Sequence, residues 1–145
     1  ASLDLGTTSQ QVGVLTLAGG VLSGGTLTAT AFNITSGTIN GNIAGSGTIT
    51  KTGDGTFTLT SENQQFTGDI FINSGTLQLG NGGSKTATLG GTNAANAGRL
   101  VNNGVLAFKF QPGTQITLFN VISGSGAIQY LPADGFTRSQ RGRLN

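Results

Sequence analysis

The sequence contains no cysteine, histidine, methionine or tryptophan, and each absence removes a class of protein. Without cysteine there is neither a disulfide framework nor a thiolate metal site. Without histidine, a serine–histidine–aspartate catalytic triad is excluded. No apolar run approaches the roughly 18–20 residues that span a bilayer, so we expect no membrane insertion by this segment. The chain also lacks an initiating methionine and a signal sequence, and we expect it to be a piece of a longer protein.

Charge is scarce as well, at 8% of residues with a net charge of +2. No basic run is dense enough for a nucleic-acid footprint, so we expect no nucleic-acid partner. Asp54 and Asp69, 15 residues apart, could lie on neighbouring corners as a carboxylate pair for glycoside hydrolysis. Aspartate is favoured in turns, however, and we interpret both as solvated corner residues. We therefore expect no catalytic residue, no cofactor and no metal site.

Glycine, by contrast, is abundant, with 26 residues in 145. It has no G-X-Y period, which excludes collagen, and the 35% of apolar residues alternate with polar ones, which argues against disorder. Units of glycine, threonine and an apolar residue begin at Gly47, Gly55 and Gly75. Each glycine can turn the chain, and each following stretch alternates as a strand does when one of its faces is buried. The spacing predicts a three-sided coil of roughly 20 residues per turn.

The alternation also predicts which side chains face the interior of such a coil. Successive inward positions should form apolar columns, and burying one leucine, isoleucine or phenylalanine is worth about 1.5–3 kcal/mol before entropy is counted. The expected inward residues are Leu15, Leu17, Leu27, Ile34, Ile39, Ile43, Ile49, Phe57, Leu59, Ile70, Ile72, Leu77, Leu79, Leu106, Phe108, Ile116, Leu118 and Ile128. With Ile70 and Ile72 inward, the period of two places Phe71 outward. Packing of Phe71 under a neighbouring loop is the alternative.

The stretch from 45 to 80 also resembles a known family. It is similar to the autotransporter-associated β-strand repeat of bacterial type V secreted proteins, whose pattern runs roughly GSGxLxKxGxGxLxLxGxNxYxGxTxVNxGTLxxG. The matching residues here are Gly45-Ser46-Gly47, Lys51, Gly53, Gly55, Phe57, Leu59, Phe66, Thr67-Gly68, Ile72-Asn73 and Gly75-Thr76-Leu77. Phe66 replaces the usual tyrosine, and Glu62, Gln64 and Asp69 also depart from the pattern. The resemblance implies a right-handed parallel β-helix, exposed at a bacterial cell surface or secreted.

The same resemblance implies a role rather than a reaction. We expect an extracellular passenger segment that acts in adhesion or host-receptor binding as a rigid scaffold. Its partner would be a host-cell surface protein or glycan, or a neighbouring bacterial cell. A proteolytically released toxin or signalling ligand is the alternative, with a polysaccharide-processing β-helix enzyme as a third reading. Open strand edges at the two ends would permit end-to-end or lateral self-association.

Recognition residues are expected where the regular pattern breaks. We predict β-helix coils over 1–136, with a corner loop or insertion at about 81–97, and a basic polar tail over 137–145. Loops on a rigid scaffold are where binding usually occurs. The candidate partner-binding residues are Phe71, Lys85, Arg99, Arg138, Arg141 and Arg143.

Overall fold

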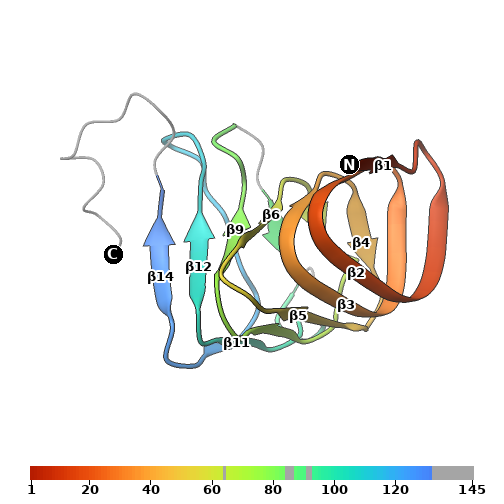
Figure 1. Cartoon of the computed structure of the whole chain (residues 1–145). Coiled ribbons are helices and arrows are strands. Elements are labelled where there is room, and N and C mark those ends of the chain that lie inside the picture. Colours follow the sequence, from red (N-terminus) through yellow and green to blue (C-terminus); the bar gives the residue numbers. More distant parts are fainter. Residues whose placement is uncertain (64, 84–86, 91–92, 132–145) are drawn as a thin grey trace.

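The protein, seen here in a computed structural model, is an all-β solenoid (Figure 1). The structure describes residues 1–63, 65–83, 87–90 and 93–131, and these contain fourteen strands and no helix. All neighbouring strands pair in parallel, and they stack into about six turns. This confirms the predicted parallel β-helix. The strands are β1 (Ser2–Asp4), β2 (Ser9–Ser23), β3 (Thr26–Ile39), β4 (Asn42–Ala44), β5 (Thr48–Lys51), β6 (Thr56–Leu59), β7 (Glu62–Asn63), β8 (Ile70–Ile72), β9 (Thr76–Leu79), β10 (Thr88–Leu89), β11 (Leu100–Asn102), β12 (Val105–Phe108), β13 (Ile122–Ser123) and β14 (Ala127–Tyr130).

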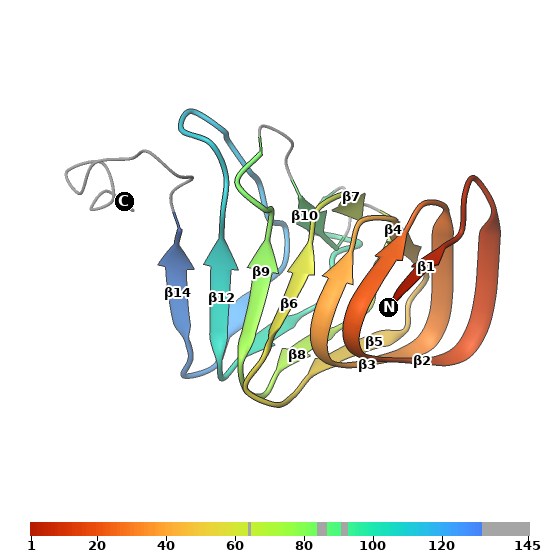
Figure 2. The ribbon, with the colours of Figure 1, turned by 45° about the horizontal axis from the view of Figure 1, so that its top comes forward.

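Each turn of the solenoid has three sides, which the long strand β3 shows within one coil. Its first residues pair with β4, its middle residues with β5 and its last residues with β6. We call the stack that contains β4, β7 and β10 side 1. Side 2 contains β5, β8, β11 and β13, and side 3 contains β6, β9, β12 and β14. Figure 2 shows the side 3 strands lying next to one another along the molecule.

The length of a coil changes along the chain. Residue Ala31 pairs with Thr48, 17 positions further on, and Ile49 pairs with Ile70, 21 positions further on. The next coil is longer, because Ile70 pairs with Leu100, 30 positions further on. The last returns to 22 positions, from Leu100 to Ile122. The predicted period of roughly 20 therefore holds everywhere except in the coil that contains residues 81–97.

Those residues are only in part a loop. Strand β10 lies within them and pairs with β7, so that this piece forms side 1 of its coil. Ala87 and Leu89 are fully buried, which an excursion from the coil would not allow. The pairing of Asn63 with Leu89 spans 26 positions, so the extra residues lie partly before β10 and partly after it. The coil in which a corner loop or insertion is predicted at about 81–97 therefore contains strand β10 within that range.

The core runs through the middle of the coil as columns of apolar side chains. The predicted inward residues from Leu27 to Leu106 are all buried, and Leu15, Leu17, Phe108, Ile116 and Leu118 pack against them. Ile128 differs, because it lies in the last coil and is 50% exposed. Large buried residues that the alternation did not select are Leu22, Phe32, Phe66, Leu89, Leu100 and Phe110. Phe66 packs edge-on against Phe32, with ring centroids 5.9 Å apart. Phenylalanine therefore fills this corner without the hydroxyl group of the usual tyrosine.

One inward position on side 2 holds a lysine. The register places Lys51 between Ile34 and Ile72, and its side chain is completely buried. Its Nζ reaches the corner between sides 2 and 3, where it donates to the carbonyl oxygens of Thr52 at 2.7 Å, Gly53 at 3.1 Å and Ser74 at 3.4 Å. Burial lowers the pKa of the Lys51 amine, and the nearby Asp54 carboxylate offsets part of that effect. The lysine therefore closes a corner by satisfying its backbone carbonyls.

Glycines allow successive coils to approach closely at the corners. At the corner between sides 1 and 2, Gly47, Gly68 and Gly98 follow one another in three successive coils. A Cβ atom at Gly68 would overlap the carbonyl oxygen of Gly47, and one at Gly98 would overlap the carbonyl oxygen of Gly68. Since every residue except glycine carries that atom, the stacking of this corner requires glycine.

Both ends of the described solenoid leave the apolar interior open. Figure 1 shows β1 and β2 at one end and β14 at the other. Among the described residues, the exposed large apolar side chains all lie in the first or last coil: Leu3, Val12, Val14, Phe119, Val121, Ile122 and Ile128. The described residues include no helix that is long and apolar enough to cross a membrane.

Candidate partner-binding face

The structure brings two of the predicted binding residues together on the outer face of side 2. Phe71 lies in the middle of β8, and Arg99 immediately precedes β11, the next strand of the same side. Lys85, Arg138, Arg141 and Arg143 fall outside the described residues. Strands β8 and β11 therefore form the centre of the candidate face.

Phe71 points outward, as the alternation predicts. Its neighbours Ile70 and Ile72 are completely buried, whereas Phe71 is half-buried. In register, it lies between Thr50 of β5 and Val101 of β11, which is also half-buried. An aromatic and a branched aliphatic side chain thus stand next to each other in an outward column.

Arg99 forms an ion pair with Asp69 of the neighbouring coil. Its guanidinium donates to Asp69 Oδ2 at 2.9 Å, and its backbone N–H donates to Oδ1, also at 2.9 Å. These hydrogen bonds hold the pKa of the Asp69 carboxyl below its ordinary value, and the carboxylate in turn raises the pKa of Arg99. The arginine side chain is 69% exposed and the aspartate 34% exposed, so both charged groups remain accessible to a partner.

Val121 extends the same surface by one more coil. The pairing of Leu100 with Ile122 places Val121 in register with Arg99, and its side chain is 74% exposed. We call Asp69, Phe71, Arg99, Val101 and Val121 the side 2 patch. Val101 and Val121 were not among the predicted binding residues. The alternation could have selected both, because each precedes or follows an inward residue of β11 or β13.

An exposed turn lies shortly before Arg99 in the chain. The backbone N–H of Ala97 donates to the carbonyl oxygen of Asn93 at 3.1 Å, which closes a single turn. The Asn93 side chain also accepts hydrogen bonds from the backbone N–H groups of Ala95, at 2.9 Å, and Asn96, at 3.2 Å. The residues 93–96 are exposed, and the chain then reaches Arg99 through the tightly packed corner at Gly98.

The acidic residues do not assemble into the pair considered for glycoside hydrolysis. Asp54 follows β5 at the corner between sides 2 and 3, whereas Asp69 precedes β8 at the corner between sides 1 and 2. Asp69 is engaged by Arg99, and Asp54 acts on the buried Lys51. Among the residues that the structure describes, no group of three or more histidine, cysteine, aspartate or glutamate side chains could hold a metal ion.

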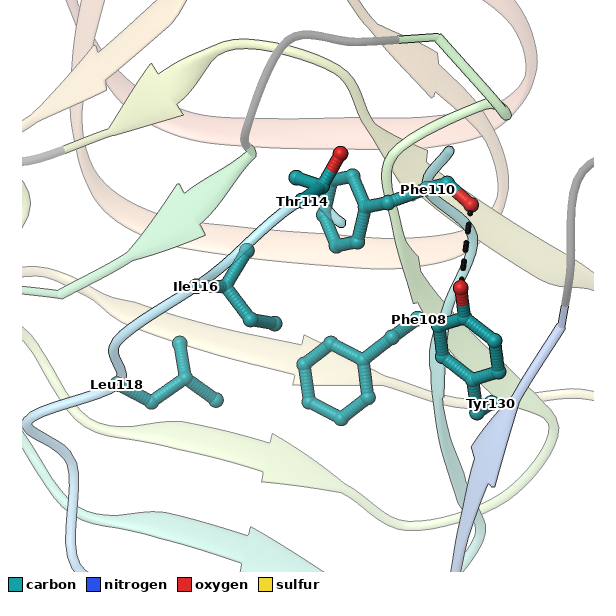
Figure 3. A pocket seen from close by; sticks show the side chains of 6 residues that line it. All are labelled: Phe108, Phe110, Thr114, Ile116, Leu118 and Tyr130. Carbon is teal, nitrogen blue, oxygen red and sulfur yellow. Dashed lines mark hydrogen bonds between the residues drawn. The ribbon is translucent and has the colours of Figure 1, made fainter. Parts of the chain in front are cut away.

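The C-terminal end of the coil contains a pocket of about 370 Å³ (Figure 3). Its lining is nearly all apolar: Phe108, Phe110, Thr114, Ile116, Leu118 and Tyr130. The Tyr130 hydroxyl donates a hydrogen bond to the carbonyl oxygen of Phe110 at 3.4 Å, so the phenol group that lines this pocket already has a backbone partner. The pocket is the open end of the core and offers apolar contact rather than acid–base groups.

Comparison with known proteins agrees with this architecture. Residues 49–79 match the family described as Passenger-associated-transport-repeat. The adhesin BmaC autotransporter of Brucella suis biovar 1 (strain 1330) is 38% identical over 126 residues, which cover 79% of this chain and 4% of that protein. No solved structure gives a significant match. The matched repeat includes Lys51, strand β8 and the second of the stacked corner glycines. The chain is a segment of an autotransporter passenger built from such repeats, a class found at the bacterial surface or secreted.

Proposed function

We propose that this segment works in adhesion, as a rigid scaffold whose side 2 patch binds a protein on a host cell. The observation that carries the proposal is the composition of the patch. Phe71, Val101 and Val121, from three successive coils, place apolar surface beside the exposed Asp69–Arg99 ion pair, on a solenoid whose outer face is otherwise mostly hydroxyl and amide. Aromatic and arginine side chains dominate the energetics of protein interfaces.

The scaffold supports the patch in two ways. Parallel backbone ladders hold Thr50, Phe71 and Val101 in fixed register, so little side-chain or loop ordering is needed on binding. The Asp69 carboxylate accepts one hydrogen bond from the Arg99 backbone N–H and one from its guanidinium, and the second bond holds the guanidinium next to Asp69, which directly precedes the strand of Phe71. The name of the relative, an adhesin, agrees with a binding role. Binding without catalysis fits the separation of Asp54 from Asp69.

The test uses beads coated with the full chain and cultured mammalian cells. Phe71→Thr introduces the same residue as Thr50, its partner in the neighbouring strand β5. Gln78→Thr is the matched control on the outer face of side 3, where Gln78 pairs with Thr58. We expect Phe71→Thr to weaken bead binding at least about tenfold, equivalent to about 1.4 kcal/mol, because a central aromatic anchor is removed. The control should bind like the parent chain.

Three outcomes would contradict the proposal. Equal binding by the parent and Phe71→Thr chains would place the contact elsewhere. Loss of binding after enzymatic removal of cell-surface glycans, with binding intact after protease treatment, would identify a glycan as the partner. Binding to bacterial cells but not to mammalian cells would assign the segment to contacts between bacteria.

A further inference from the structure

The sequence contains three asparagine–glycine pairs, the dipeptides at which asparagine most readily loses its side-chain amide. They begin at Asn40, Asn81 and Asn103. In this reaction the backbone nitrogen of the glycine attacks Cγ of the asparagine, and glycine favours the attack because it has no β-carbon to obstruct it. All three asparagines are exposed, so exposure and sequence alone predict similar rates. The structure distinguishes the three pairs by the hydrogen bonding of the glycine N–H.

Two of the three glycine N–H groups are held in hydrogen bonds. Gly82 donates to the carbonyl oxygen of Lys109 at 2.7 Å, and the Gly104 N–H donates to Asn102 Oδ1 at 3.2 Å. A nitrogen bonded in this way must give up its hydrogen bond before it can lose its proton and turn towards the asparagine side chain. The asparagines that precede these two glycines should therefore be protected in the folded chain.

The third glycine, Gly41, lies at the corner between sides 3 and 1, and its N–H is not held in this way. The residues on either side of it are bonded to the preceding coil. The backbone N–H of Asn40 donates to the carbonyl oxygen of Leu22 at 2.8 Å, and that of Asn42 donates to Gly25 at 3.0 Å. None of the described residues accepts a hydrogen bond from the Gly41 N–H. The reaction can therefore begin at this nitrogen without the loss of a hydrogen bond.

The side-chain carbonyl of Asn40 is also activated for this attack. The hydroxyl of Thr60, in the next coil, donates to Asn40 Oδ1 at 2.6 Å. Negative charge develops on Oδ1 as the glycine nitrogen adds to Cγ, and a donor that is already in place stabilises that charge. Oδ1 remains in the product, so the departure of the side-chain nitrogen does not break this hydrogen bond.

We infer that Asn40 is a site of spontaneous deamidation, which the fold leaves reactive while it protects the other two asparagine–glycine pairs. After the Gly41 nitrogen loses its proton to hydroxide, it forms a bond to Asn40 Cγ. The Cγ–Nδ2 bond breaks, and ammonia leaves with a proton taken from water. Water then opens the resulting succinimide ring at either carbonyl, which gives aspartate or isoaspartate. Either product places a carboxylate in residues 5–50, a stretch without any charged residue.

The experiment follows deamidation of the full chain at pH 8. Samples are digested with pepsin at acidic pH, and mass spectrometry measures the replacement of NH₂ by OH in the peptide that contains each asparagine–glycine pair. A parallel sample in concentrated guanidinium chloride gives the rate of each pair in the unfolded chain. Asn40→Gln is the blocking variant. A change at Gly41 is unsuitable, because a Cβ atom there would overlap the carbonyl oxygen of Gly24.

We expect folding to slow the reaction at Asn81 and Asn103 at least about fivefold, the factor that corresponds to one hydrogen bond, and to leave Asn40 close to its unfolded rate. Asn40→Gln should remove the fast modification without changing the other two rates. Equal protection of all three pairs, or a faster reaction at Asn81 or Asn103 than at Asn40, would overturn the proposal. Thr60→Val removes the donor to Oδ1 and should slow the reaction at Asn40 alone. An unchanged or faster rate in that variant would overturn the activating role of the hydroxyl.

Discussion

Replacing Lys51 by methionine should destabilise the solenoid, because the carbonyl oxygens of one corner would lose their donor. Methionine has a similar length and no charge, so the substitution removes the ammonium group while filling most of its space. Two of the three hydrogen bonds, at 2.7 and 3.1 Å, have good lengths, and the third, at 3.4 Å, is long. Counting about 1–2 kcal/mol for each good bond gives a loss of about 2–4 kcal/mol.

The assay is urea unfolding at pH 7, followed by far-ultraviolet circular dichroism. Lys109→Met is the control, because Lys109 is a partly exposed lysine near the end of β12, and its replacement should change the unfolding free energy by less than about 0.5 kcal/mol. Equal or greater stability of Lys51→Met would refute the reasoning. It would mean that desolvation of the ammonium costs more than its hydrogen bonds contribute, as happens for some buried ion pairs.

The pH dependence of stability provides a second readout of the same lysine. Burial lowers its pKa in the folded state below the value of about 10.4 that applies in the unfolded chain. Between these two values the unfolded state binds more protons, so this group alone makes the unfolding free energy rise with pH. The rise should appear in the parent chain and be absent from Lys51→Met. A stability difference between the two chains that is flat from pH 8 to 11 would contradict it.

Three further predictions test the assignment of faces, corners and charges. Leu59→Asp buries an unpaired charge and should lower the urea midpoint far more than Thr58→Asp, so similar midpoints would show that the faces are reversed. Gly68→Ala should cost at least about 2–3 kcal/mol in urea unfolding, because its Cβ overlaps a backbone carbonyl oxygen, whereas Gly13→Ala, which meets open space, should be nearly neutral. The lowered pKa of Asp69 adds stability at neutral pH that is lost as the pH falls through its folded-state value, and Asp69→Asn should remove that acid-sensitive component from unfolding curves recorded between pH 2 and 6.

The fold could be predicted from the sequence because its determinants are local. A strand with one buried face shows a period of two, and a corner that needs close backbone approach requires glycine. The inward orientation of Ile49, Phe57 and Leu77 can therefore be predicted from the residues next to them in the sequence. The orientation of Phe71 follows from the same rule. These features depend on a residue and its nearest neighbours in the chain rather than on distant contacts.

The features that escaped prediction depend on contacts between coils or on the position of a coil in the stack. Lys51 occupies an inward position by apolar alternation, but only the corner carbonyls of the same and the next coil make a buried ammonium tolerable there. The burial of Leu89 depends on the pairing of β10 with β7, 26 residues away. Ile128 follows the inward pattern yet remains half exposed, since no described coil covers it.

The separation between inner and outer positions bears on how a solenoid of this kind can acquire a binding face. The inward neighbours of Phe71 are fully buried and tied to the coils on either side, so changes there act on folding. Phe71 itself faces out, and its column holds threonine below it and valine above it without any change in register. Each coil interacts mainly with its neighbours, so one outward substitution perturbs stability locally while it alters the surface offered to a partner. A patch such as the one on side 2 can therefore be specified by a few outward residues, with the ladder supplying their spacing.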